Sequence, residues 1–202
     1  MTDHDMLQTL LNEAGIRDDA IAAVMRVDAV MQQWRRKTAK RELSHRAVAS
    51  LGLDLELAQL DVLFAIAAPA HEFGGASGET MVGTVADRLG IDPSRASRIV
   101  ADMVAAGYAR RSVSQADARR TVLELTPLGE AVVDAVQAYK WLFLGDFFSG
   151  WSAEDVARFV PLIERFTDWT DTARDDARFA SEIGRLAKRI SAAREESEPV
   201  PA

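Results

Sequence analysis

The sequence predicts a mainly α-helical fold that contains one helix-turn-helix and one two-stranded sheet. Apolar residues recur at helical spacing along almost all of the 202 residues. The exceptions are the segments 108–112 and 121–125, in which polar and apolar residues alternate as in antiparallel strands. Apolar residues on both sides of Gly90 have the spacing of two short helices joined by a tight turn. We expect long helices before and after this central region.

The composition is that of a globular chain and not of a disordered one, with 48% hydrophobic and 27% charged residues. The net charge of −7 disfavours a protein that coats polyanions over its whole surface, so a nucleic-acid surface must be local. Cysteine is absent, which excludes disulfides, thiolate metal sites and cysteine nucleophiles. Neither a secretory signal nor a membrane-spanning apolar run is found, and we expect a cytoplasmic protein.

Three helices are predicted before the helix-turn-helix. A short one ends at Gly15, and a long one covers 18–50. A more buried helix begins near Leu57 and is expected to stop before Pro69, because the residue that precedes proline resists the helical conformation. The glycine-rich stretch 71–80 lacks the features of a phosphate-binding loop and is interpreted as a surface connector.

The second helix of the helix-turn-helix has a well-defined start. Asp92 suits the N-cap and Pro93 the first helical position. Helical spacing turns apolar side chains inward and leaves a polar set on or near the opposite surface, namely Ser94, Arg95, Ser97, Arg98 and Asp102. Arginine can bind guanine through two hydrogen bonds, and serine can reach base edges or phosphates. This set therefore predicts a helix that reads the major groove of DNA.

The two strands form a wing whose tip covers 114–120. Six arginines and three aspartates lie between residues 91 and 120, so this region is positive within an acidic chain. At the tip, Arg119 and Arg120 are predicted to contact phosphates or the minor groove, and Asp117 to orient one of them.

The segments after the wing carry large apolar faces. A helix that follows Pro127 and another that follows Ser152 have more apolar surface than a small winged helix needs. The tail from 175 to 196 is a further predicted helix, which can pack across a dimer or on the same subunit.

Six blocks of the chain resemble, in order and spacing, those of MarR-type winged helix-turn-helix transcriptional regulators. The blocks are Leu60–Ala67, Val85–Gly90, Ser97–Val100, Gly107–Arg111, Asp117–Arg120 and Leu125–Gly129. The last two blocks together are the most specific. The resemblance extends from about residue 18 to residue 172, and the remaining segments are additions.

The resemblance implies a homodimer that presents two reading helices to one palindromic operator in double-stranded DNA. It also implies a repressor that a small anionic or aromatic effector releases. The expected parts are an N-terminal extension helix (1–16), a dimerisation helix (17–54), the winged helix-turn-helix (55–126), dimerisation helices (127–174) and a C-terminal extension with a frayed tail (175–202).

Four residues are candidates for an effector pocket, because an aromatic wall beside a cationic group suits an aromatic carboxylate. They are Trp34, Arg41, Phe64 and His71. Ordinary packing is the competing interpretation for the aromatic residues. The basic run 35–46 is interpreted as a solvated helix face, a phosphate-contacting patch or an effector subsite.

The sequence predicts neither an enzyme nor a cofactor or metal site. It has no nucleophile elbow and no phosphate loop, and its three histidines lie far apart. The alternative to a DNA-binding regulator is a helical interaction protein whose degenerate winged helix binds a protein partner. The outward arginines on both the helix and the wing favour DNA.

Overall fold

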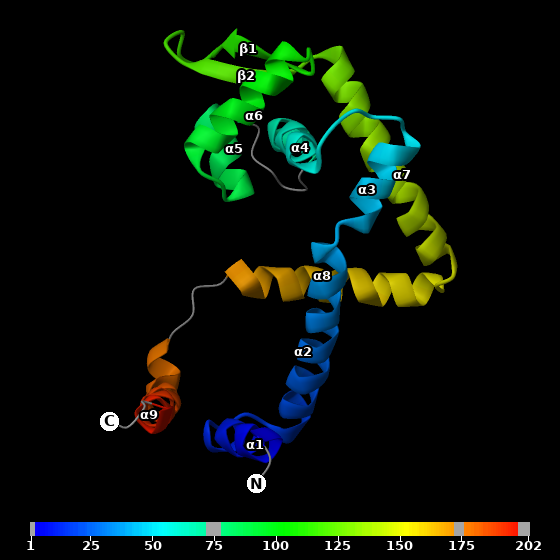
Figure 1. Ribbon diagram of the computed structural model, residues 1–202. Coiled ribbons are helices and arrows are strands. Elements are labelled where there is room, and N and C mark those ends of the chain that lie inside the picture. Colours follow the sequence, from blue (N-terminus) through cyan, green and yellow to red (C-terminus); the bar gives the residue numbers. More distant parts are fainter. Residues whose placement is uncertain (1–2, 72–77, 172–175, 198–202) are drawn as a thin grey trace. The chain divides into compact units, whose positions relative to one another are not determined.

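The computed structural model describes residues 3–71, 78–171 and 176–197 (Figure 1). The chain divides into two compact units, one of residues 40–152 and one of residues 1–39 with 153–202. None of the described helices is long and apolar enough to cross a membrane.

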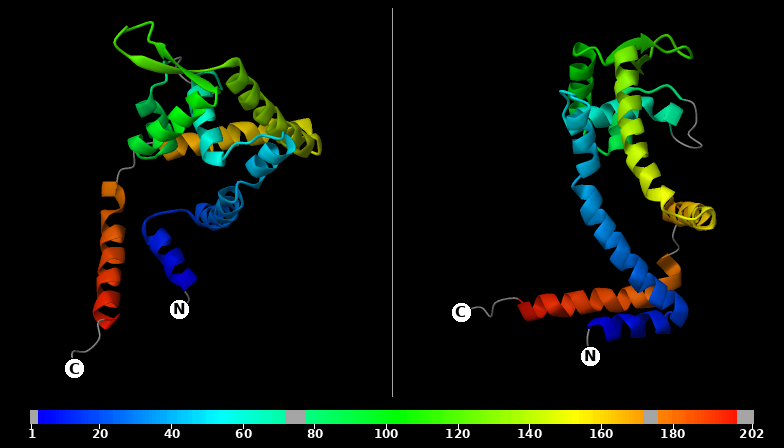
Figure 2. Two further views of the ribbon diagram at one scale, coloured as in Figure 1. Left: turned by 45° about the horizontal axis from the view of Figure 1, so that its top comes forward. Right: turned by 90° about the vertical axis from the view of Figure 1, so that its right-hand side faces the viewer.

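The unit of residues 40–152 has the predicted helix-turn-helix and two-stranded sheet, which confirms the predicted fold class. Its elements are α3 (Glu42–Ser50), α4 (Leu57–His71), α5 (Val82–Leu89), α6 (Pro93–Ala105), β1 (Ala109–Val113), β2 (Thr121–Leu125) and α7 (Pro127–Ser149). The strands pair antiparallel, with Ala109 opposite Leu125 and Val113 opposite Thr121. In Figure 2 this hairpin (green) projects from the helices as a wing.

The core of this unit forms around α4. Leu60, Val62 and Leu63 of α4 are almost completely buried. Side chains from α5, α6 and α7 pack in the same cluster, among them Val85, Val100, Met103, Val133 and Val136. Apolar burial of this kind is the main stabilising contribution to the unit, so α6 is held firmly against the rest of it.

The predicted helix 18–50 is wrong as a single element, because the structure breaks it at Lys40 and Arg41. The first part is α2 (Asp18–Ala39) and the second is α3. Arg41 has a left-handed backbone with φ of 50°, which is uncommon outside glycine. Its guanidinium donates two hydrogen bonds to the Asp61 carboxylate of α4, at 2.9 and 2.5 Å. This ion pair stabilises the break between α2 and α3. The spacing of apolar residues along 18–50 does not indicate where the helix breaks.

The predicted stop before Pro69 is also wrong, since α4 continues to His71. Proline has no N–H to donate to the carbonyl four residues earlier, which is that of Ala65. The Ala65 carbonyl instead accepts a hydrogen bond from Arg88 Nη1 of α5 at 2.7 Å. A tertiary contact thus replaces the missing helical bond and lets the helix pass through the proline.

The second unit joins both terminal extensions. It consists of α1 (Asp3–Glu13), α2, α8 (Ala153–Asp171), a 3-10 turn η1 (Asp176–Phe179) and α9 (Ala180–Ser197). Arg185 of α9 forms an ion pair with Glu13 of α1, and Leu186 lines a shallow hollow together with Leu10. The tail helix therefore packs on the same subunit in this structure, which is one of the two arrangements left open by its sequence.

Candidate nucleic-acid interface

The turn of the helix-turn-helix is built by three residues. Gly90 ends α5 in the left-handed conformation with φ of 61°. The Asp92 carboxylate then caps α6 by accepting the N–H groups of Ser94 at 2.8 Å and Arg95 at 3.3 Å, and Pro93 takes the first helical position. The Ser94 hydroxyl, followed by these N–H groups, lowers the pKa of Asp92 below its ordinary value. The start of α6 is therefore fixed by an ionised cap.

Helix α6 separates its apolar and polar faces. Ala96, Val100 and Met103 are buried and Ile99 is half-buried. The five outward residues of the sequence prediction are all exposed, namely Ser94, Arg95, Ser97, Arg98 and Asp102. This places two guanidinium groups and two hydroxyls on the first two turns of the helix.

Sequence reasoning missed two neighbours of this face at the start of α4. Glu56 and Gln59 line one shallow groove together with Arg95, Arg98 and Asp102. The Gln59 side-chain oxygen accepts the Glu56 N–H at 2.9 Å. The spacing of three residues between Glu56 and Gln59 is that of a capping box. This spacing is the sequence signal from which the contact between Glu56 and Gln59 could be predicted.

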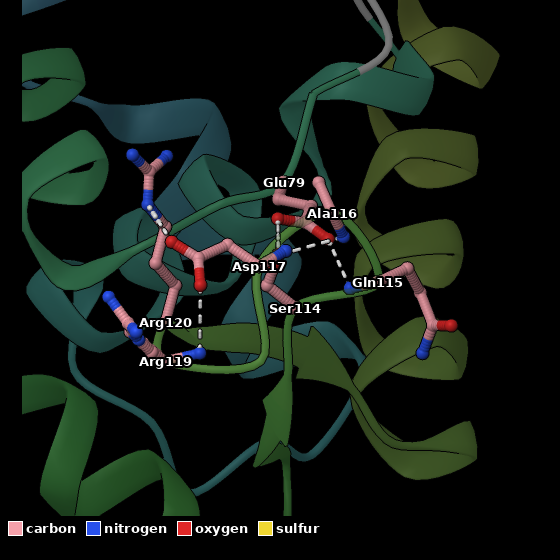
Figure 3. Close-up of polar contacts among 7 residues, drawn as sticks. All are labelled: Glu79, Ser114, Gln115, Ala116, Asp117, Arg119 and Arg120. Atoms are coloured by element: carbon pink, nitrogen blue, oxygen red, sulfur yellow. Dashed lines mark hydrogen bonds and ion pairs between the residues drawn. The ribbon is translucent and has the colours of Figure 1, made fainter.

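The tip of the wing is a turn held by hydrogen bonds (Figure 3). Ser114 Oγ accepts the N–H groups of Ala116 at 3.1 Å and Asp117 at 2.9 Å. The Asp117 carboxylate accepts the Arg119 N–H at 3.0 Å and pairs with Arg120 Nε at 3.4 Å. Among the described residues the Arg119 guanidinium has no ion-pair partner. Asp117 thus orients Arg120 and leaves the Arg119 charge open to solvent.

The base of the wing is joined closely to α7. Thr126 caps α7 through its hydroxyl, which accepts the Gly129 N–H at 3.2 Å and donates to the Gly107 carbonyl at 2.6 Å. A Cβ atom on Gly129 would lie 2.0 Å from the Tyr108 carbonyl oxygen. Only glycine allows this approach, which explains why the block 125–129 ends in one.

Sequence reasoning also missed Glu79, because the pattern of the stretch 71–80 predicts only a surface connector. The Glu79 carboxylate accepts the Ser114 hydroxyl at 2.5 Å and the Gln115 N–H at 2.8 Å. The hydrogen bond from Ser114 is the main reason why the pKa of Glu79 lies below its ordinary value. Gly78 is exposed, and the predicted connector at 72–77 lies outside the described residues.

Two of the four candidates for an effector pocket, Arg41 and Phe64, have described contacts with other side chains. Arg41 is paired with Asp61, so its charge is already compensated. Lys140 Nζ of α7 lies 4.8 Å from the centre of the Phe64 ring. Burial, and then the charge of Arg41, lower the pKa of this lysine. Sequence reasoning missed both Asp61 and Lys140, whose link to Arg41 and Phe64 is tertiary.

The other two candidates are Trp34 and His71. Trp34 lies on α2, in the other unit, with 60% of its surface exposed. The side chain of His71 lies outside the described residues. The part of the chain that the structure describes contains no group of three or more acidic or histidine side chains that could hold a metal ion.

Residues 53–120 match the model of the MarR family, and this segment contains α4, the helix-turn-helix, the first strand of the wing and its tip. This segment is therefore similar to the corresponding part of MarR family proteins. The predicted resemblance is thereby confirmed. MarR family proteins are transcription regulators and not enzymes.

Solved structures give the same result for the fold. A MarR family protein from Bacillus stearothermophilus is 15% identical with a TM-score of 0.60, and the match covers 73% of this chain and 98% of that one. RV1404 from Mycobacterium tuberculosis is 20% identical with a TM-score of 0.56, covering 75% and 96%. MepR from S. aureus, solved with bound ethidium bromide, is 16% identical with a TM-score of 0.50, covering 68% and 95%.

Comparison with curated proteins and comparison with solved structures give different results. No curated protein matches the sequence. At identities of 15–20%, the solved MarR-type structures show a shared fold. The match of residues 53–120 to the MarR family model is what supports a DNA-binding transcription regulator.

Proposed function

We propose that this protein is a homodimeric repressor that binds a palindromic operator and is released by a small anionic or aromatic effector. It acts on double-stranded DNA in the cytoplasm. The proposal goes beyond the general role of a MarR-type regulator in three ways. It names the residues that contact DNA, the dimer and the class of effector.

The observation that carries the proposal is the exposed polar face on the first two turns of α6. Ser94, Ser97 and Arg98 are assigned to base edges in the major groove, where hydroxyl and guanidinium groups discriminate between bases. Arg95 is assigned to phosphate, because phosphate contacts orient a protein on the duplex.

The wing supplies the second part of the DNA surface. Arg119 and Arg120 are assigned to phosphates or the minor groove, and Asp117 to their orientation. Arg110 is bound to Glu124 within the wing, with 2.8 Å between Nη2 and the carboxylate, and is not assigned to DNA.

Exposed apolar surface supports a homodimer. On α7, Trp141 and Leu142 are 62% and 72% exposed, and Leu144 and Phe147 are also exposed. On α8, exposed large apolar side chains include Leu162 and Trp169. Apolar surface of this extent marks an interface, and a second copy of the chain supplies a matching one through two-fold symmetry.

Effector release follows from differential affinity. A ligand can shift the protein away from DNA only by as much as it prefers the non-binding dimer, and about 1.4 kcal/mol of preference changes occupancy tenfold. MepR, a structural neighbour, binds ethidium. We retain Trp34, Arg41, Phe64 and His71 as candidates for the effector pocket.

The test begins with selection of duplexes from a randomised pool by the wild-type protein. The enriched duplex and a scrambled duplex are then titrated in gel shifts at two salt concentrations. We expect the selected duplex to bind at least about 10³-fold more tightly, with affinity that falls steeply as salt rises.

Two variants complete the test. Arg98→Ala should lose the preference for the selected duplex, whereas Arg194→Ala, which removes an exposed charge from α9, should keep it. Lack of enrichment together with lack of binding at low salt would reject the DNA-binding proposal and favour a protein partner.

A further inference from the structure

We propose that Glu79 positions the DNA-contacting wing by fixing the turn 114–117 from outside the hairpin. Glu79 precedes α5 in sequence and is separated from this turn by the whole helix-turn-helix. The inference rests on the proposed DNA-binding function and adds a positioning residue to it.

Glu79 binds the turn at two points. One carboxylate oxygen accepts the Ser114 hydroxyl at 2.5 Å, and the other accepts the Gln115 N–H at 2.8 Å. Ser114 is only 5% exposed and has a single hydroxyl hydrogen, which it gives to Glu79. Its oxygen then accepts two N–H groups of the turn, so Glu79 determines how the Ser114 side chain is oriented.

The contacts continue from Ser114 to the wing arginines (Figure 3). Ser114 holds the N–H of Asp117, and the Asp117 carboxylate holds the N–H of Arg119 and the side chain of Arg120. An unbroken series of hydrogen bonds and one ion pair therefore links Glu79 to both arginines.

Two backbone hydrogen bonds also close the wing tip, from the Ser114 N–H to the Arg120 carbonyl at 3.0 Å and from the Arg120 N–H to the Asp117 carbonyl at 2.9 Å. The strands end at Val113 and begin again at Thr121, and Val113 is 57% exposed. The residues Gln115, Ala116 and Ala118 are exposed as well. Since the described residues form no apolar core at the tip, its conformation depends on these polar contacts.

Glu79 itself stands on a fixed backbone. The neighbouring Thr80 is 3% exposed, and its carbonyl accepts the Leu123 N–H of β2 at 2.7 Å. The Thr80 hydroxyl also accepts a hydrogen bond from Arg88 Nη1 at 3.0 Å. A rigid attachment beside the carboxylate is what a positioning residue requires.

The sign of the charge makes this role testable. A carboxylate near a DNA-binding surface repels phosphates, so removal of an ordinary surface acid leaves DNA affinity unchanged or raises it. If Glu79 positions the wing, its removal lowers DNA affinity although the protein becomes less negative.

The experiment compares Glu79→Ala and Glu79→Gln with Asp134→Asn, which removes an exposed charge of α7 in the same unit. We expect Glu79→Ala to bind the selected duplex about three- to tenfold more weakly, with a log–log salt slope reduced by about 1, as for the loss of one phosphate contact. Glu79→Gln keeps one acceptor oxygen and should fall between Glu79→Ala and wild type. Affinity of both Glu79 variants equal to or above that of Asp134→Asn overturns the proposal.

A double-mutant cycle tests whether Glu79 acts through the arginines. In a protein that already carries Arg119→Ala and Arg120→Ala, Glu79→Ala should have almost no further effect on DNA affinity. A full additional loss would show that Glu79 acts elsewhere and would overturn the assignment.

A measurement without DNA separates this inference from the proposed function. In Glu79→Ala the Gln115 amide should exchange its hydrogen faster than in wild type, while amides of α6 keep their protection. Unchanged exchange at Gln115 overturns the positioning role. If wild type binds neither duplex, the proposed function is wrong. Faster exchange at Gln115 would then show only that Glu79 stabilises the turn 114–117.

Discussion

Helix α6 and the wing tip present groups to the same proposed DNA surface, but they are positioned by different physical means. Helix α6 is held by buried apolar side chains, with Met103 only 1% exposed, whereas the tip is held by hydrogen bonds between the buried Ser114 and neighbours that are exposed or half-buried. Burial ties the geometry of α6 to the stability of the whole unit. The tip can change its position at little cost to the fold, so stability and DNA affinity should respond separately to mutations in the two regions.

The largest expected effect comes from the anchor of α6. Met103→Ala removes a buried side chain and should lower the free energy of unfolding by about 2–5 kcal/mol. Val113→Ala in the wing, where the side chain is exposed, should change it by less than about 0.5 kcal/mol. Urea unfolding of both variants measures the difference, and equal losses would remove the distinction between the regions.

The next effect concerns base recognition by α6. Arg98→Ala should cost about 1–3 kcal/mol on the selected duplex and much less on the scrambled one, because a contact to a base edge is lost. Gel-shift titrations of the two duplexes give the ratio. An equal loss on both would show that Arg98 contacts phosphate.

A smaller and more uniform effect is expected in the wing. Arg119→Ala should weaken binding to every duplex by a similar factor and reduce the log–log salt slope by about 0.9, the value for one phosphate contact. The measurement is binding at several salt concentrations. Loss of preference for the selected duplex, with an unchanged slope, would instead assign base recognition to the wing.

The smallest effect is the pH dependence of the α6 cap. The pKa of Asp92 is lowered from 3.8 in the folded protein, so its cap contributes fully above that value and is lost as the pH falls through the lower, folded pKa. Asp92→Ala should therefore lower the Tm by a few degrees at neutral pH.

Thermal unfolding of wild type and Asp92→Ala across the acid range measures this dependence, with Asp134→Asn as the control. The difference in Tm between wild type and Asp92→Ala should shrink below about pH 4. A difference that stays constant to low pH would show that the ionised carboxylate is not what caps the helix.

Local signals in the sequence are sufficient to predict the start and the buried face of α6. They are insufficient to predict the parts of the structure that tertiary contacts hold. Asp92 and Pro93 lie next to the helix that they begin, and the spacing of its apolar residues identifies the buried face. Glu79 and Ser114 are 35 residues apart, and Arg41 and Asp61 are 20 apart. No local pattern links such pairs.

Pro69 shows how a tertiary contact can also reverse a local preference. The rule that a helix ends before proline reflects a lost hydrogen bond and a steric restriction. Arg88 supplies the Ala65 carbonyl with a new donor, and the helix continues. The donor lies 23 residues away, so the sequence around Pro69 could not indicate it.

The division of the chain into two units also sets an order for folding. Residues 40–152 are continuous, whereas the other unit needs both ends of the chain, and its Glu13–Arg185 ion pair closes a separation of 172 residues. During synthesis the winged helix is complete before α9 has been made, while α1 must wait for a partner that is translated much later. Since domains fold as units and distant contacts form slowly, the winged helix can mature on the ribosome, and assembly of the terminal helices becomes a late step.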